Sequence, residues 1–453
     1  MHVDKISKPI SSIFLLMTLI KKEIRNSFLS LKFQVVVLMF GILSIFGTML
    51  LIVNFEERIE SSGKGMAALE EMSSEYGIRK GWGLNLPLPI RPLEGAFPGA
   101  SPDKEGTLYL HVMSPPELQK SIGELTPDKL FPPVTITFVI TIIGTLLTIL
   151  IAHDVVTREK ETGTLGLTLS NSVSRDILLF AKWIGNFFTV WFAFTLFFLI
   201  SVLLLTLVPT QFSLDGQWNR LVLIYVVSLL LLSLFFNFGL LFSTLTHNSR
   251  NALILLLFSW ALFVYVIPDI SPYAAGAFRK LPSVQEILAK HLELSLQFEE
   301  SRSERQDNLF VSEGENSQEQ MDKVFEEIME RNIREVNQLD REFRSRLNNQ
   351  VALARTLSSL SPVAVGTFLI TDIAGTGIIA HENLGSTIQE YWETVCEEWS
   401  FLEEMGDLPE FSERELNWKE IFVRDRIDVI LLLVLNVVFF LGAYVAFLRY
   451  DVR

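Results

Sequence analysis

The sequence predicts a mainly α-helical, polytopic membrane protein with six transmembrane helices and two large loops outside the membrane. Hydrophobic residues make up 49% of its 453 residues and charged residues 20%, so apolar and charged segments must be separated along the chain. A bilayer core about 30 Å thick requires roughly 20 apolar residues per spanning helix. The stretches that meet this requirement are 33–53, 134–152, 183–208, 221–242, 251–267 and 427–448, the fifth being the shortest.

Residues 1–32 are expected to form a cytoplasmic arm. The first apolar patch, 13–20, leads into Lys21 and Lys22 rather than into a small-residue cleavage site, so no cleavable signal peptide is expected. Apolar residues at helical spacing predict an amphipathic helix lying on the inner membrane surface, the alternative being an extension of the first span. These residues are Ile13, Leu16, Ile20, Ile24 and Phe28.

The distribution of Lys and Arg predicts the orientation. The basic arm remains inside, and six crossings bring the tail, 449–453, back to the same side, so both termini are expected in the cytoplasm and the chain in the cell (inner) membrane. The loops 54–133 and 268–426 then lie outside. The second carries 31 acidic and 16 basic residues, a net charge of −15 against −14 for the whole chain. This acidity argues for a solvated outer domain and against a nucleic-acid partner.

The two outer loops differ in their patterns. Gly and Pro punctuate 54–133, which predicts a small irregular lobe, with a strand where TLYLHV alternates at 107–112. In 268–426, apolar residues recur every three to five positions over 321–351 and predict one long amphipathic helix. Its apolar stripe requires a partner, either the neighbouring segment near 283–298 or a second subunit.

Segment 359–377, SLSPVAVGTFLITDIAGTG, is apolar but interrupted. A spanning helix here would give an odd number of crossings, so we expect the segment to dip into or lie on the outer leaflet. The residues expected to shape it are Pro362, Gly366, Asp372, Gly375 and Gly377. The single cysteine, Cys396, excludes an intrachain disulfide and a CxxC site, and leaves plain packing or a reactive thiol.

The chain has no motif for catalysis or phosphate binding. There is no GxxxxGK[ST], HExxH or GxSxG sequence, and the six histidines show no ligand spacing. The polar residues of the predicted spans are uncharged, and they either pack helices together or line a substrate path. They are Thr137, Thr141, Thr145 and Thr148 in the second span, Asn237 in the fourth and Asn436 in the sixth. Because the predicted spans carry no ionisable residues deep in the membrane, transport driven by a proton or sodium gradient is not expected. The energy for transport must then come from another polypeptide.

Segment 153–182 is short, charged and helix-prone between two apolar runs. Thr157 or Asp154 is expected to cap a helix, Gly163 to interrupt it, and Ser174 to begin a second helix that enters the third span. Taken alone, this pattern also fits an ordinary solvated loop.

The run REKETGTLGLTLSNSVSRDILLFAK within this segment resembles the signature after the second span of ABC exporter permeases of the type-2 class. Ser172 stands where that family usually has Pro, and Gly166 where Glu is common. Two further segments are similar to a subgroup with large outer loops, namely LSSLSPVAVGTFLITDIAGTG and the closing FLRYDVR. The matching residues are Arg158, Glu159, Glu161, Gly163, Thr164, Leu165, Leu169, Val173, Ser174, Arg175 and Lys182.

The resemblance implies that 153–182 holds a coupling helix that fits a groove in a cytoplasmic ATPase. The residues expected to contact the ATPase are Arg158, Glu159, Glu161, Thr162 and Thr164. It also implies a second permease, either a copy or a paralogue, and two ATPase subunits that hold ATP and Mg, so this chain itself binds no cofactor. The helix at 13–32 would be a second ATPase contact.

The resulting expectation is an exporter of an amphipathic or hydrophobic cargo such as a peptide, lipid or drug. The candidate path residues are Thr137, Thr141, Thr145 and Asn237, and the candidate outer gate consists of Pro362, Gly366, Gly375 and Gly377. Two alternatives remain: a signalling or scaffold protein that transports nothing, and a device that transmits ATP-driven motion to an extracytoplasmic partner.

Overall fold

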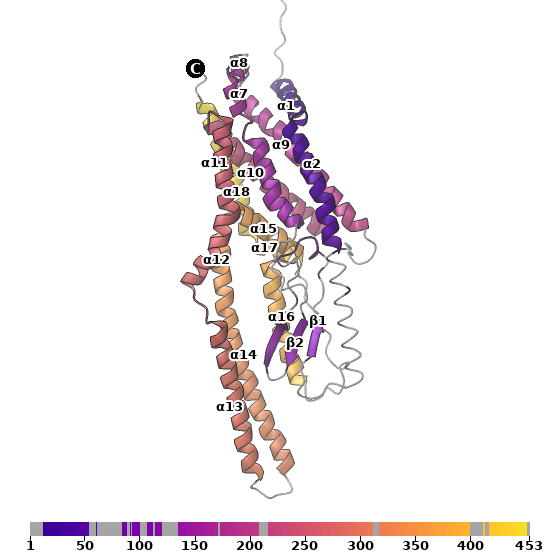
Figure 1. The fold of residues 1–453 in the computed structure, drawn as a ribbon, viewed down its shortest axis with the longest axis vertical. Coiled ribbons are helices and arrows are strands. Elements are labelled where there is room, and N and C mark those ends of the chain that lie inside the picture. Colours follow the sequence, from indigo (N-terminus) through magenta and orange to yellow (C-terminus); the bar gives the residue numbers. More distant parts are fainter. Residues whose placement is uncertain are drawn as a thin grey trace, which may run out of the picture.

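The computed structural model of the protein describes residues 12–53, 60, 84–87, 91, 93–99, 107–111, 114–119, 135–170, 173–207, 216–310, 317–398, 411–412 and 416–450. Expectations for the start of the arm, for most of loop 54–133, for Ser172, for the side chain of Cys396 and for the last three residues fall outside this description. The molecule is elongated, with a helical bundle at one end and a long helical hairpin at the other (Figure 1).

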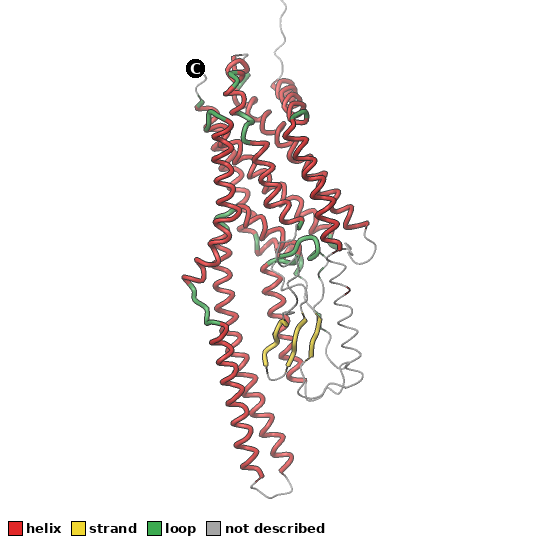
Figure 2. The backbone as a smooth tube through the Cα atoms, viewed as in Figure 1, coloured by secondary structure: helices red, strands yellow, loops and turns green. Residues whose placement is uncertain are grey.

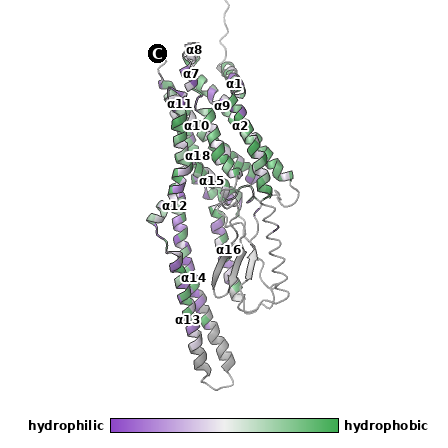
Figure 3. Cartoon of the chain, in the orientation of Figure 1, coloured by the Kyte–Doolittle hydropathy of each residue, from purple (hydrophilic) through white to green (hydrophobic). Residues whose placement is uncertain are grey.

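Among the residues that the structure describes, six helices are long and apolar enough to cross a membrane, which confirms the predicted mainly α-helical, polytopic fold class. They are Leu31–Val53, Ile136–Glu161, Arg175–Leu207, Trp218–Leu245, Ser249–Phe278 and Arg426–Arg449. Figure 3 shows hydrophobic residues concentrated on this bundle and hydrophilic residues on the hairpin. Some helices extend beyond the apolar stretches in the sequence. The helix Arg175–Leu207, for example, begins before the stretch 183–208, and the side chain of its first residue, Arg175, bonds to the carbonyl of Leu448.

The bundle contains helical elements in chain order, several of them interrupted by short π-helical turns (η). They are α2 (Leu31–Ile42), η1 (Leu43–Gly47), α5 (Ile136–Phe138), η2 (Val139–Gly144), α6 (Thr145–Ala152), α9 (Arg175–Leu207), α10 (Trp218–Leu245), α11 (Ser249–Ala261), η3 (Leu262–Val266), α12 (Ile267–Phe278) and α18 (Arg426–Arg449).

Helix α10 is the centre of the bundle. It packs against α6, α9, α11, α15 (Pro362–Ala374) and α18. Phe235 and Phe236 of α10 are fully buried. A Cβ atom on Gly239 would lie 2.4 Å from the Cβ of Ala152, so the small residue permits α10 and α6 to approach closely.

Short helices gather at the bundle end where the described chain starts and finishes, which we call the α7 end (Figure 1). They are α1 (Ser12–Phe28), α7 (Thr157–Glu161) and α8 (Thr164–Ser170). Helix α1 is separate from α2 and packs along α9. The predicted helix within the arm is therefore present, and its position on the membrane surface stays a prediction.

The opposite end, which we call the hairpin end, carries α13 (Val284–Phe310) and α14 (Ser317–Ser358). Helix α14 packs against both α12 and α13, which confirms the predicted long helix and identifies the neighbouring segment as its partner within the chain. Beside it lie α16 (Ile378–Glu398), α17 (Trp418–Arg424) and a small sheet, drawn in yellow in Figure 2. The sheet has the order β1 (Leu84–Pro87), β2 (Thr107–His111), β3 (Ser114–Gln119) and is antiparallel, and β2 is the predicted strand.

Candidate functional site

Helices α7 and α8 form the predicted coupling segment at the α7 end. Gly163, with a φ of 71°, separates them, as the sequence indicated. The expected cap by Thr157 or Asp154 is wrong: no side chain of the segment caps α7, and the Ser243 hydroxyl of α10 accepts hydrogen bonds from the amides of Val156 and Thr157 at 3.0 and 3.2 Å. A residue of another helix supplies the cap, so α7 is attached to α10 from its first turn.

A buried cation connects α7 to two other helices. The Nζ atom of Lys182, on α9, lies 2.8 Å from a carboxylate oxygen of Glu159 on α7 and 3.6 Å from one of Glu23 on α1. The Lys182 side chain is only 2% exposed. Glu23 also accepts a hydrogen bond from Asn186 of α9 at 3.5 Å. Because removing one member would leave a buried unpaired charge, these groups hold α1, α7 and α9 as one unit.

The next two residues of α7 cap the ends of neighbouring spanning helices. Lys160 donates hydrogen bonds to the carbonyls of Thr244 and Thr246 at 2.5 and 3.0 Å, where α10 ends. Glu161 accepts hydrogen bonds from the amide and the hydroxyl of Ser249 at 2.6 and 3.0 Å, where α11 begins. A cation at a helix carboxyl end and an anion at an amino end both match the helix dipole, so α7 bridges α10 and α11.

The closing tail is fixed at the same end. Arg175, the first residue of α9, donates hydrogen bonds to the carbonyls of Leu448 and Tyr450 at 2.5 and 3.0 Å. The Tyr444 hydroxyl of α18 donates to Asp176 at 2.9 Å. Lys160 lies over the Tyr450 ring, 4.4 Å from its centroid. Helix α18 is therefore connected to the same set of contacts.

The outer face of α7 and α8 points away from the bundle. Arg158, Glu161, Thr162 and Thr164 are exposed there, and Glu159 is partly buried. The carboxylates of Glu159 and Glu161 are bonded to Lys182 and Ser249 of the spanning helices, whereas Arg158, Thr162 and Thr164 face solvent. Leu167 is 68% exposed on α8, while Leu165 is 2% exposed. The sequence reasoning missed Leu167, whose signal would have been a leucine placed half a helical turn from the buried one.

The candidate path residues lie inside this chain. Thr137, Thr141 and Thr145 are buried, and the hydroxyls of Thr141 and Thr145 donate to the carbonyls of Thr137 and Thr141 on their own helix. Asn237 donates to Asn436 of α18 at 3.0 Å and accepts from Trp183 of α9 at 2.6 Å. This geometry is that of interhelical packing, and a role in a substrate path stays a prediction.

The candidate outer gate is helix α15 and the turn that follows it. Pro362 stands in the first turn of α15, where the hydroxyl of Ser361 accepts from the amide of Ala364. Gly366 packs against Leu231 of α10. Gly375 ends the helix with a φ of 78°, and α15 meets α16 at an angle of 45°. Nearly all of α15 is buried among the bundle helices rather than lying on their surface.

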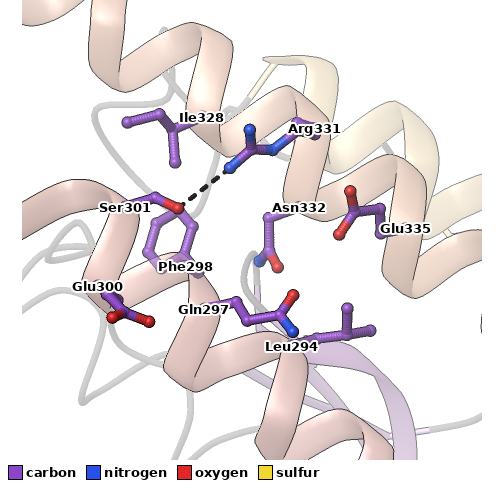
Figure 4. A pocket seen from close by; sticks show the side chains of 9 residues that line it. All are labelled: Leu294, Gln297, Phe298, Glu300, Ser301, Ile328, Arg331, Asn332 and Glu335. Carbon is purple, nitrogen blue, oxygen red and sulfur yellow. Dashed lines mark hydrogen bonds between the residues drawn. The ribbon is translucent and has the colours of Figure 1, made fainter. Parts of the chain in front are cut away.

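A polar cavity of about 440 Å³ lies between α13 and α14 (Figure 4). Arg331 donates a hydrogen bond to Ser301 across it at 3.2 Å, and Asn332 and Glu335 line it from α14. Its mixed polar lining shows no preference for one ligand class. Among the residues that the structure describes, no group of three or more His, Cys, Asp or Glu side chains is placed to hold a metal ion.

The six helices and the site at the α7 end define a multi-pass membrane protein whose helices are connected through one short surface helix. The sequence profile of the ABC-2 family transporter proteins matches residues 17–452, so the chain belongs to that family. A relative named "Probable multidrug ABC transporter permease YbhS", from Escherichia coli strain K12, is 41% identical over 120 residues. That alignment covers 26% of this chain and 29% of the relative, and the same holds for the protein of that name in Escherichia coli O157:H7.

Proposed function

We propose that this chain is the transmembrane permease subunit of an ATP-driven exporter, moved by a separate cytoplasmic ATPase that binds α7 and α8. Family membership supports the permease class, and the lack of a GxxxxGK[ST] motif in the sequence supports assigning ATP and Mg to the partner. The exporter contains a second permease, a copy or a paralogue, and works surrounded by membrane lipids.

The observation that carries this proposal is the pair of opposite faces on α7 and α8. The inward face contacts α9 through the ion pair between Glu159 and Lys182, α10 through Lys160, and α11 through Glu161. The outward face offers Arg158 and Leu167 to solvent. A force applied to the outward face therefore reaches several spanning helices without passing through a flexible loop.

The orientation follows from the charges at the two ends. The loop at the hairpin end, 268–426, carries a net charge of −15, whereas α1 at the α7 end carries Lys21, Lys22 and Arg25. Because cationic flanks tend to stay inside, these charges support an orientation with the α7 end and both termini in the cytoplasm.

The cargo is an amphipathic or hydrophobic molecule. Between its two charged ends, the described part of the bundle buries uncharged polar residues such as Thr141, Asn237 and Asn436, which bond to their own or to neighbouring helices. This middle part offers an ionic substrate no charged partner. The relative's name, a probable multidrug permease, agrees with this class.

The exposed leucine provides the test. Replacing Leu167 by Asp should weaken binding of the copurified ABC ATPase about tenfold and remove transport-linked ATPase stimulation, since a buried apolar anchor at an interface carries about 1–2 kcal/mol. Leu292→Asp is the matched control, because Leu292 is 60% exposed but lies on α13 at the hairpin end. Binding and stimulation equal to the parent chain in Leu167→Asp would remove the assignment.

Substitution of Glu159 gives a less direct test of the ATPase contact. A lysine at this position would face Lys182 across 2.8 Å and disturb the bundle whether or not an ATPase binds. Arg158→Glu avoids this difficulty. Arg158 is exposed, so this substitution reverses a charge on the outward face and leaves the inward contacts unchanged.

A second candidate function, transmission of motion to an extracytoplasmic partner, is favoured by the length of the hairpin. Helix α14 runs for 42 residues and packs on α12 of the fifth spanning helix. ATP hydrolysis that depends on an added outer partner and not on cargo would support this function over export.

A further inference from the structure

Four charged residues meet where the hairpin joins the bundle. Arg355, near the carboxyl end of α14, places its Nη2 atom 3.0 Å from Asp372 of α15 and 2.8 Å from Asp425, which lies between α17 and α18. The same nitrogen lies 2.9 Å from Asp428 in the first turn of α18. One guanidinium thus connects the outer hairpin, the candidate gate helix and the last spanning helix.

The group is buried and its charges do not balance. The side chains of Asp372, Asp425 and Asp428 are 0%, 3% and 14% exposed, and that of Arg355 is 19% exposed. Three carboxylates face one cation, so full ionisation leaves two uncompensated negative charges away from water, which is costly. The Oδ2 atom of Asp425 accepts no hydrogen bond from any residue in the described ranges.

A proton on Asp425 reduces this imbalance. Burial, and then the nearby charge of Asp372, raise the pKa of Asp425 to about 7, while Arg355 opposes the shift. Asp428 also faces Asp425, and its charge acts in the same direction as that of Asp372. Burial raises the pKa of Asp372 as well, to about 6, so Asp425 is the first of these two carboxylates to take up a proton as the pH falls. Arg424 and Arg426, its chain neighbours, are exposed and do not join the group. Asp425 therefore changes its charge near neutral pH while it stays in contact with Arg355.

We propose that Arg355 positions α15 and α18 against the hairpin, and that a proton taken up by Asp425 closes this contact, which we call the Arg355 latch. Calling α15 the gate rests on the proposed export function. The latch itself requires only the contacts of Arg355, so it can be tested without an ATPase or a cargo.

The sign of the pH dependence follows from linkage. In the closed latch Asp425 holds its proton up to about pH 7. In an open latch it faces water and loses its proton near its ordinary pKa of about 4. The closed state therefore binds one proton more between these values, and lowering the pH from 8 to 6 should favour it about tenfold.

Spin-label distances across the latch provide the test. Cysteines at Glu342 on α14 and Val423 on α17, both exposed, are introduced with Cys396→Ser, and the full chain is measured in lipid nanodiscs from pH 5 to 9. The ratio of the short-distance to the long-distance population should rise about tenfold between pH 8 and pH 6. Distances that do not change with pH would overturn the proposal.

Two variants and a control distinguish the latch from simple packing. Asp425→Asn, which cannot ionise, should keep the short distance at every pH, whereas Arg355→Met should lose it at every pH. If Arg355→Met fails to insert, Asp425→Asn alone decides. Glu382→Gln, a change at an exposed carboxylate on α16, should retain the parent profile. A parent-like pH profile in Asp425→Asn would contradict the proposal.

Discussion

Lys182 is buried in the bundle, where the carboxylates of Glu159 and Glu23, rather than water, compensate its charge. Replacing it by Met keeps the length of the side chain but leaves Glu159 and Glu23 without their cation, and such a loss costs on the order of 3–5 kcal/mol. We expect Lys182→Met to lower the thermal stability of the purified protein and to weaken the attachment of α7 to α9. Thermal unfolding in nanodiscs measures the change.

A double variant shows whether the charge or the packing matters. Lys182→Met with Glu159→Gln removes both partners of the 2.8 Å pair and should recover part of the lost stability. Lys21→Met, at an exposed position of α1, should behave like the parent. Equal stability of Lys182→Met and the parent would show that the ion pair does not hold the helices together.

Asn237 and Thr141 should respond differently to loss of their polar groups. Asn237 bonds to two other helices through Asn436 and Trp183, so Asn237→Leu should destabilise the bundle by about 1–2 kcal/mol. The Thr141 hydroxyl bonds only to its own helix, so Thr141→Val should cost less and leave transport unchanged. Altered cargo selectivity in Thr141→Val would instead place this residue in a substrate path.

At the scale of elements, Glu161 couples α7 to the start of α11. Its carboxylate accepts both the amide and the hydroxyl of Ser249, and an amino-terminal cap of this kind contributes about 1 kcal/mol. Glu161→Ala should therefore raise amide hydrogen exchange over residues 249–252 while leaving the middle of α11 unchanged. Ser170→Ala, on the exposed end of α8, is the control. Unchanged exchange at Ser249 would mean that α7 does not restrain α11.

The helices themselves were well predicted from the sequence, because the thickness of a bilayer and the spacing of apolar residues act locally. The long helix α14 followed from apolar spacing alone, whereas the same spacing left its partner open between the segment that forms α13 and a second subunit. The start of α9 at Arg175 agrees with the helix expected to begin at Ser174, although hydropathy alone would have started it later. The sequence could not show the contacts with Leu448 and Glu159 that hold the charged residues of this first part of α9. Periodicity does not show which distant residue will supply such a contact.

At the scale of the whole molecule, the groups that join its parts are distant in sequence. Arg355 meets Asp372 and Asp425 only because α14, α15 and α18 converge, and Lys182 meets Glu23 only because α1 packs on α9. The sequence predicted both the coupling segment and the gate segment as separate motifs. It could not show that one residue, Lys182 or Arg355, would connect each motif to several helices.

The charges of the two ends predict the sidedness of the molecule. Thr164 at the α7 end and Glu293 on α13 are both exposed, so each can be replaced by a single cysteine in the Cys396→Ser background. A membrane-impermeant maleimide should label Thr164→Cys only in inside-out vesicles and Glu293→Cys only in right-side-out vesicles, because cationic flanks remain in the cytoplasm. Labelling of Thr164→Cys from outside would place α7 and α8 beyond the reach of any cytoplasmic ATPase, and the proposed coupling would be impossible.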